Sequence, residues 1–154
     1  MIVALDLELA LDLIAEDLPA AERQAHTLGL SLQRGEDERA FDFYVPYTAQ
    51  DGQDYLIRLR CDGYDEQAPS FQFVNPQNPE ETGPQWWARM AGIGYPRGDQ
   101  GEVVYCTPGI REYHQHSSHH SEQHPKSVWK LARVIWLTWK YLYDSGSYAG
   151  RGGV

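Results

Sequence analysis

The stretch AFDFYVPYTAQDGQDYLIRLRCDGYDEQAPSFQFV, residues 40–74, decides the fold. Apolar and polar residues alternate within 40–47, 55–61 and 70–74, and this two-residue period is typical of half-buried β-strands. The sequence AQDGQ at 49–53 is typical of a hairpin turn between the first two runs. Together with a shorter candidate strand at 30–34, these runs predict a four-stranded antiparallel meander.

The residues before the meander are rich in leucine, alanine and acidic residues. Leucines alternate with other residues over 5–13, as in a strand, but the composition favours a helix. We therefore predict a helix over residues 2–18, with Pro19 opening a second short turn that ends near Leu28. No basic residue occurs through position 18, which indicates either a solvated acidic face or a docking surface for a basic partner.

The strand pattern ends after the meander, in a long loop over residues 75–100. Prolines and glycines interrupt it, whereas its two adjacent tryptophans argue against disorder, so we expect a loop at the active site. A brief apolar run at 103–105 then leads to Cys106, and Thr107-Pro108-Gly109 breaks the chain. The loop and this break predict that Cys106 lies at an exposed functional position.

The most regular pattern in the chain follows Pro125. Apolar residues recur at helical spacing from 128 to 142, which predicts a C-terminal helix. The last segment, 144–154, is rich in glycine and serine and is expected to be a flexible tail. The sequence thus predicts an α+β fold, with a single domain over residues 1–143.

Bulk properties narrow the class of protein. A chain of 154 residues with 42% hydrophobic residues suits one core. A net charge of −9 gives no general attraction to phosphate backbones, so we expect no nucleic-acid partner. No apolar run approaches the roughly 20 residues needed to span a bilayer, and the N-terminus lacks the pattern of a secretory signal. These features predict a cytoplasmic protein with no membrane partner, whose two cysteines are free thiols.

The two cysteines differ in their surroundings. Cys61 ends an alternating apolar run and is expected to be inert core, whereas Cys106 lies between an apolar run and a polar segment. A thiol with an ordinary pKa near ~8.5 is mostly protonated at neutral pH, and nearby cations or hydrogen-bond donors raise its thiolate fraction. Arg111, His114 and His116 are close in sequence. We therefore predict a catalytic site made of Cys106, His114 and His116.

The histidines after Cys106 leave two other interpretations open. Their side chains and the cysteine sulfur supply enough nitrogen and sulfur ligands for a zinc site, and their spacing allows chelation. No paired Cys-x2-Cys or His-Glu-x2-His motif is present, however. They can equally be unliganded residues of a polar loop. The histidines concerned are His114, His116, His119, His120 and His124.

Three stretches, taken in order, resemble the ubiquitin-conjugating enzymes. CDGYDEQAPSFQFVNP at 61–76 is similar to the family's strand, Tyr- and Pro-bearing loop and fourth strand. GEVVYC at 101–106 is similar to the short approach to the family's nucleophile, and WKLARVI at 129–135 to the helix after the active site. The shared order of elements covers about residues 5–143. The family's His-Pro-Asn tripeptide is absent, since residues 86–105 contain neither His nor Asn, and the N-terminal helix is acidic rather than basic.

This resemblance implies both a fold and a function. It implies a UBC-like α+β fold and a catalytic Cys106 that accepts a ubiquitin-like protein as a thioester from a ubiquitin-activating-type enzyme. The modifier then passes to an amine of a target protein, and no cofactor is needed because the activating enzyme consumes the ATP. The His-rich segment is closer to divergent members from bacterial ubiquitin-like operons, which implies a role in antiviral defence. The alternatives are a zinc- or other metal-binding protein that uses the His-rich segment, and a non-catalytic interaction domain.

Overall fold

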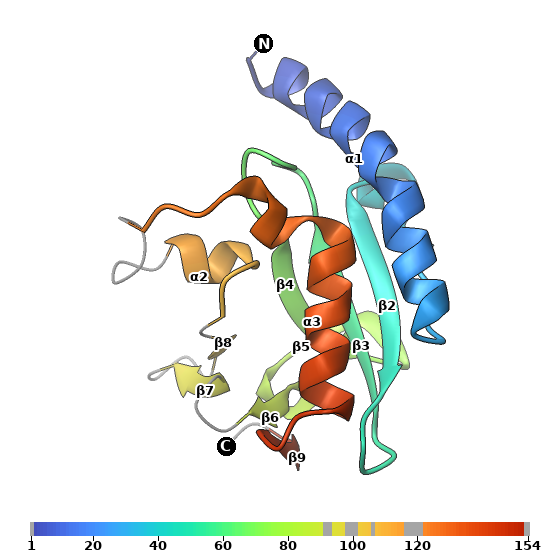
Figure 1. The fold of residues 1–154 in the computed structure, drawn as a ribbon, viewed down its shortest axis with the longest axis vertical. Helices are drawn as coiled ribbons and strands as arrows, with labels where there is room; N and C mark the ends of the chain where they lie inside the picture. Colours follow the sequence, from blue (N-terminus) through green and yellow to red (C-terminus); the bar gives the residue numbers. More distant parts are fainter. Residues whose placement is uncertain (1, 91–93, 98–101, 106, 116–121, 153–154) are drawn as a thin grey trace.

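Two long helices pack together against one face of a curled antiparallel sheet (Figure 1). They are α1 (Ile2–Thr27) and α3 (Leu131–Tyr143). The computed structural model describes residues 2–90, 94–97, 102–105, 107–115 and 122–152. Within these ranges, no helix combines the length and the apolar character needed to cross a membrane. The predicted α+β class is therefore present, with one helix before the antiparallel sheet in the sequence and one after it.

The main sheet contains every strand of the predicted meander, in sequence order. Phe43, Ile57 and Phe73, from three adjacent strands, are fully buried under the two helices, as the alternating pattern requires. Each strand pairs antiparallel with the next, with Phe43 opposite Leu59 and Ile57 opposite Phe73. The strands, in order, are β1 (Gln33–Arg34), β2 (Asp42–Thr48), β3 (Asp54–Arg60), β4 (Ser70–Asn75) and β5 (Asn78–Thr82).

The sheet has five strands, and the prediction of four is wrong because β5 was assigned to the loop. Every residue of β5 is exposed, so it shows no alternation, and Pro79 argued against a strand. Proline is tolerated on an edge strand, where its missing N–H faces away from the ladder. Its pairing is limited, with Thr82 opposite Val74 and Asn78 opposite Asn75. β5 therefore forms because its backbone pairs with the edge of the sheet, and not because it buries a regular set of side chains.

α1 is one continuous helix, although the sequence predicted a break at Pro19. Proline inside a helix removes one hydrogen bond and clashes with the preceding turn. Small or aliphatic side chains on both sides of Pro19 are nevertheless buried in the same core, namely Ile14 before it and Ala21 and Ala25 after it. Continuous burial of one face through the proline thus outweighs its local cost.

Two short strand pairs lie outside the main sheet. β6 (Ala88–Met90) pairs with β9 (Tyr148–Arg151), and β7 (Gly94–Arg97) pairs with β8 (Glu102–Tyr105). β9 lies within residues 144–154, where the sequence predicted a flexible tail. Its backbone is held by β6 and by a hydrogen bond from the N–H of Gly152 to the carbonyl oxygen of Trp87, 3.0 Å.

Short helices complete the described chain. Trp86 ends a 3-10 turn, and Trp87, the next residue, is buried against the sheet. The predicted C-terminal helix begins with a 3-10 turn and becomes α-helical only after an extended residue, Lys130. The short helices are the 3-10 turns Asp37–Arg39, Pro84–Trp86 and Lys126–Trp129 and the helix α2 (Arg111–Gln115).

A buried carboxylate fastens the loop after β3 to the start of α3. Asp65 is almost fully buried and accepts hydrogen bonds from Lys130 and from Lys126, the latter at 3.2 Å. Trp129 donates its indole N–H to the backbone oxygen of Asp65, 2.8 Å. Burial by itself raises the pKa of Asp65, but the two ammonium groups outweigh it and hold that pKa below its usual value.

Asp65→Asn is expected to lower the free energy of unfolding by about 1–3 kcal/mol near neutral pH. Because the folded-state pKa of Asp65 is depressed, its stabilisation is present above the unfolded pKa near 3.8 and is lost as the pH falls through the folded value. In urea unfolding, the difference between the two proteins should therefore be constant above about pH 5 and should shrink as the pH falls below about 4. Asp144→Asn, at an exposed position after α3, is the control; a loss that stays constant with pH would contradict the ion-pair account.

Candidate functional site

The predicted catalytic residues lie around the short connection between β8 and α2. Cys106 and His116 both fall outside the described residues, whereas His114 lies on α2. The described backbone stops at Tyr105, the end of β8, and resumes at Thr107. The site is therefore known through the segments that precede and follow Cys106.

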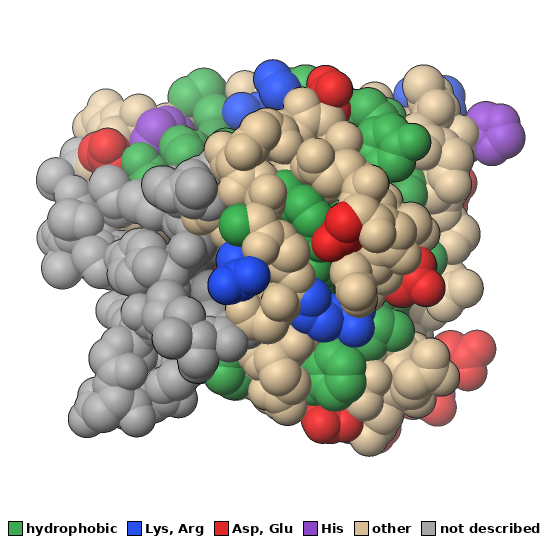
Figure 2. Space-filling view, turned by 90° about the horizontal axis from the view of Figure 1, so that it is seen from below, with side chains coloured by type: hydrophobic (Ala, Val, Ile, Leu, Met, Phe, Trp, Pro, Cys, Tyr) green, Lys and Arg blue, Asp and Glu red, His purple; other side chains and the backbone are tan. Residues whose placement is uncertain are grey.

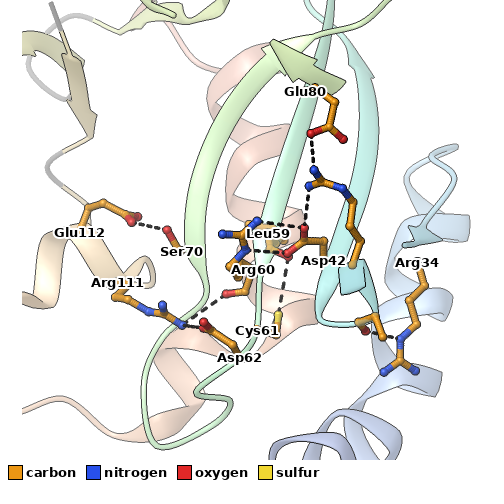
Figure 3. Close-up of polar contacts among 12 residues, drawn as sticks. Arg34, Asp42, Leu59, Arg60, Cys61, Asp62, Ser70, Glu80, Arg111 and Glu112 are labelled. Carbon is orange, nitrogen blue, oxygen red and sulfur yellow. Dashed lines mark hydrogen bonds and ion pairs between the residues drawn. The ribbon is translucent and has the colours of Figure 1, made fainter. Parts of the chain in front are cut away.

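Arg111, at the start of α2, is bound to the loop between β3 and β4. Its Nη2 donates to Oδ1 of Asp62 at 2.6 Å (Figure 3). Its Nε donates to the carbonyl oxygen of Ala68 at 3.1 Å. Its backbone N–H donates to the carbonyl oxygen of Pro69, 2.9 Å. The sequence placed Arg111 among the cations near Cys106, but these partners assign its guanidinium to anchoring α2.

Glu112 provides the second anchor of α2. Its carboxylate accepts a hydrogen bond from the hydroxyl of Ser70 at 2.5 Å and one from the backbone N–H of Phe71 at 2.8 Å. Figure 3 shows the first of these beside the Arg111–Asp62 pair. The carboxylate thus supplies a hydrogen-bond acceptor for a backbone N–H at the start of β4. Sequence reasoning missed Glu112, because no local pattern links it to residues about forty positions earlier.

His114 holds the turn that directly follows Cys106. Its Nε2 accepts a hydrogen bond from the backbone N–H of Gly109, 3.1 Å, so this nitrogen carries no proton. The imidazole also contacts the rings of Trp129 and His124, with centroid distances of 4.8 and 5.2 Å. The hydrogen bond between Gly109 and His114, five residues apart, therefore holds the turn against α2.

Gly109 is required by the geometry of this turn. Its φ is +118°, a conformation that residues with a side chain rarely adopt. A Cβ at this position would also lie 3.0 Å from the carbonyl oxygen of Val128. Thr107 and Ile110 are buried on either side. The backbone after Cys106 is thus packed against the segment before α3.

The other described histidine of the His-rich segment, His124, lies beside the same helix. Nε2 of His124 is 3.8 Å from a carboxylate oxygen of Glu122, too far for a hydrogen bond, and is buried without a hydrogen-bond partner. Tyr113 donates its hydroxyl to Glu122 at 2.9 Å. Among the described residues, no group of three or more His, Cys, Asp or Glu side chains is placed to hold a metal ion. His119 and His120 lie outside these residues, so the metal alternative stays a prediction.

Cys61 occupies the core, as predicted. It is a free thiol with no exposed surface. Burial raises the pKa of this thiol well above its ordinary value, and the positive charge of Arg111 offsets only part of that effect. A buried, protonated thiol cannot exchange acyl groups. Thioester chemistry in this chain would therefore have to use Cys106.

A second group of polar and aromatic side chains fastens β9 to the sheet. The guanidinium carbon of Arg151 lies 4.9 Å from the ring centroid of Tyr55 and 5.7 Å from that of Trp86. The hydroxyls of Tyr55 and Tyr148 are 2.7 Å apart, and Tyr148 donates to Asp51 at 2.9 Å. Figure 2 views the molecule from this end, where Lys and Arg side chains gather near the centre and Asp and Glu lie around them.

No protein-family model matches the chain, and no curated protein matches it. The case for a function therefore comes from the residues of this chain and their arrangement.

Proposed function

We propose that this chain is a conjugating-type carrier with a UBC-like fold. Cys106 accepts a ubiquitin-like protein as a thioester from an activating enzyme and passes it to an amine of a target protein, in the cytoplasm of a cell that uses the system for defence. The observation that carries the proposal is the fixed turn after Cys106, which the Gly109–His114 hydrogen bond closes. The order of the elements supports the fold, with a helix, an antiparallel sheet, the cysteine and then a C-terminal helix.

The proposed reaction consists of two acyl transfers. In the first, the Cys106 thiolate attacks the carbonyl carbon of the thioester on the activating enzyme. A new C–S bond forms, the old C–S bond breaks, and the enzyme's cysteine leaves as a thiolate. In the second, a target amine attacks the new thioester and loses a proton to solvent, and Cys106 leaves as a thiolate. ATP is consumed only by the activating enzyme.

The anchored turn suits this chemistry because acyl exchange depends mainly on positioning and on donors for the oxyanion. His114 serves as a positioning residue, since its Nε2 is occupied by the N–H of Gly109. His116 is the proposed group that assists at the reacting atoms. The two anchors of α2, Arg111 and Glu112, keep the turn at a fixed place relative to β4.

The test is reconstitution with purified proteins. The chain is mixed with its cognate activating enzyme, ATP and the ubiquitin-like protein, and the products are separated without reductant. We expect an adduct larger by the mass of the modifier, which disappears on adding a thiol and which peptide mapping places on Cys106. A reaction without ATP is the control. An activating enzyme that becomes charged but transfers nothing to the chain would contradict the proposal.

A further inference from the structure

A row of polar side chains crosses the face of the main sheet that is turned away from α1 and α3. In each strand, the residues that face the helices alternate with residues that project to this other side. On that side the register places Tyr44 of β2 opposite Arg58 of β3, and Arg58 opposite Gln72 of β4. Directly opposite residues have Cβ atoms about 5 Å apart, so the three side chains are neighbours. All three are partly exposed, so solvent reaches the row.

Arg58, at the centre of this row, has no ion-pair partner in the described part of the chain. Its guanidinium makes no hydrogen bond or ion pair there. Burial, and after it the positive charge of Arg60, lower the pKa of Arg58 below its usual value. The guanidinium nevertheless stays charged at neutral pH. A partly buried charge that is left unpaired costs free energy, and an anion bound beside it would recover that cost.

The carboxylates around Arg58 are bound by other arginines. Asp42 is 2% exposed and accepts hydrogen bonds from Nε and Nη2 of Arg60 at 2.9 and 3.2 Å (Figure 3). Nη1 of Arg39 lies 3.5 Å from the same carboxylate, and its Nη2 binds Glu80 of β5. Among the described residues, three guanidinium groups thus face two carboxylates here. The region has an excess of one positive charge, although the whole chain carries −9.

Tyr44 and Gln72 supply further hydrogen-bond donors on the two sides of Arg58. The hydroxyl of Tyr44 can donate one hydrogen bond, and the amide nitrogen of Gln72 can donate two. The planar guanidinium of Arg58 can donate to two oxygens of one anion. Donors on both sides of a guanidinium suit an anion with at least three acceptor oxygens, which phosphate has and a carboxylate lacks.

We propose that Tyr44, Arg58 and Gln72 bind a phosphate group, either as inorganic phosphate or as the terminal group of a small ligand. Arg58 binds two of its oxygens, and Tyr44 and Gln72 donate to the others. A nucleic acid is not the source, because the overall charge of −9 repels an extended phosphate backbone, whereas a single phosphate group meets only the local excess of positive charge. The site shares no residue with the proposed catalytic site, so the inference does not rest on the thioester proposal.

The test titrates inorganic phosphate into the full chain at an ionic strength held constant with sodium chloride. We expect saturable NMR shifts of the Nε–H signal of Arg58 and of the backbone amides of Tyr44 and Gln72. Arg58→Gln should weaken binding about tenfold, and Arg58→Lys should weaken it less, because lysine keeps the charge but not the planar fork. Tyr44→Phe, which removes only the hydroxyl, should weaken it about threefold. Binding of methyl phosphate at the same signals would assign the site to phosphoesters as well, and its failure to bind would assign the site to the free ion.

Arg23→Gln is the matched control. Arg23 is exposed on α1, which packs against the other face of the sheet, so its replacement removes the same charge and should leave the affinity unchanged. Equal weakening in this control would show that phosphate senses only the overall charge, and it would overturn the proposal. Full affinity in Arg58→Gln, or shifts that do not saturate or that centre on Lys126 and Lys130, would also overturn it. Circular dichroism checks that every variant is folded.

Discussion

Cys106→Ala is expected to abolish the thiol-sensitive adduct completely. A thioester requires a sulfur nucleophile, and alanine supplies neither a nucleophile nor a leaving group. The measurement is the fraction of chain converted to adduct under single-turnover conditions with a charged activating enzyme. Because the substitution removes only one atom, the far-ultraviolet circular dichroism of the variant should match that of the wild type.

Cys61→Ala is the matched control for this experiment. Cys61 is fully buried, and burial keeps its thiol protonated, so it cannot receive the modifier. This variant should form adduct at the wild-type rate while losing some stability, because a buried sulfur is removed. Adduct on Cys106→Ala, or its loss on a folded Cys61→Ala, would contradict the assignment of Cys106 as the carrier.

Phe73→Ala is expected to have the largest effect on stability, about 3–5 kcal/mol. Phe73 is fully buried in β4, and its ring lies 5.1 Å from the centroid of Trp87, 5.2 Å from that of Phe71 and 5.5 Å from that of Tyr55. Truncation removes these aromatic contacts and leaves a cavity between the sheet and the segment that leads to β6. Urea denaturation followed by tryptophan fluorescence would measure the loss.

Gln72→Ala tests whether the effect belongs to the core. Gln72 neighbours Phe73 on β4 but projects to the opposite face of the sheet, where it is only half-buried. Its replacement should change the free energy of unfolding by less than about 1 kcal/mol. Similar losses in the two variants would mean that the strand itself, rather than the packing of Phe73 on Trp87, accounts for the result.

The elements that bury one regular face were predictable from sequence. β2, β3 and β4 alternate apolar and polar residues because one face of each is covered by helices, and α3 repeats its apolar residues with the helical period for the same reason. The burial of Cys61 follows from the same alternation, since it continues the inward-facing positions of β3. In each case the burial of a side chain can be predicted from the types of the residues next to it in the sequence.

Edge strands and side-chain anchors were not predictable in this way. β5 and β9 form through backbone hydrogen bonds at an edge, and backbone groups are the same for nearly every residue type. The hydrogen bonds of Glu112 and Arg111 join positions more than forty residues apart, so neither shows a local pattern. The sequence singled out His114 but not its partner, the N–H of Gly109.

The sequence by itself determined the α+β class, the order of the main strands and helices, and the burial of Cys61, because periodic burial leaves a periodic pattern in the chain. Tertiary structure alone decided that α1 continues through Pro19, that the sheet has a fifth strand, and that α2 is fastened to β4. Those outcomes depend on contacts between distant segments, whose free energies exceed the local preferences of the residues involved.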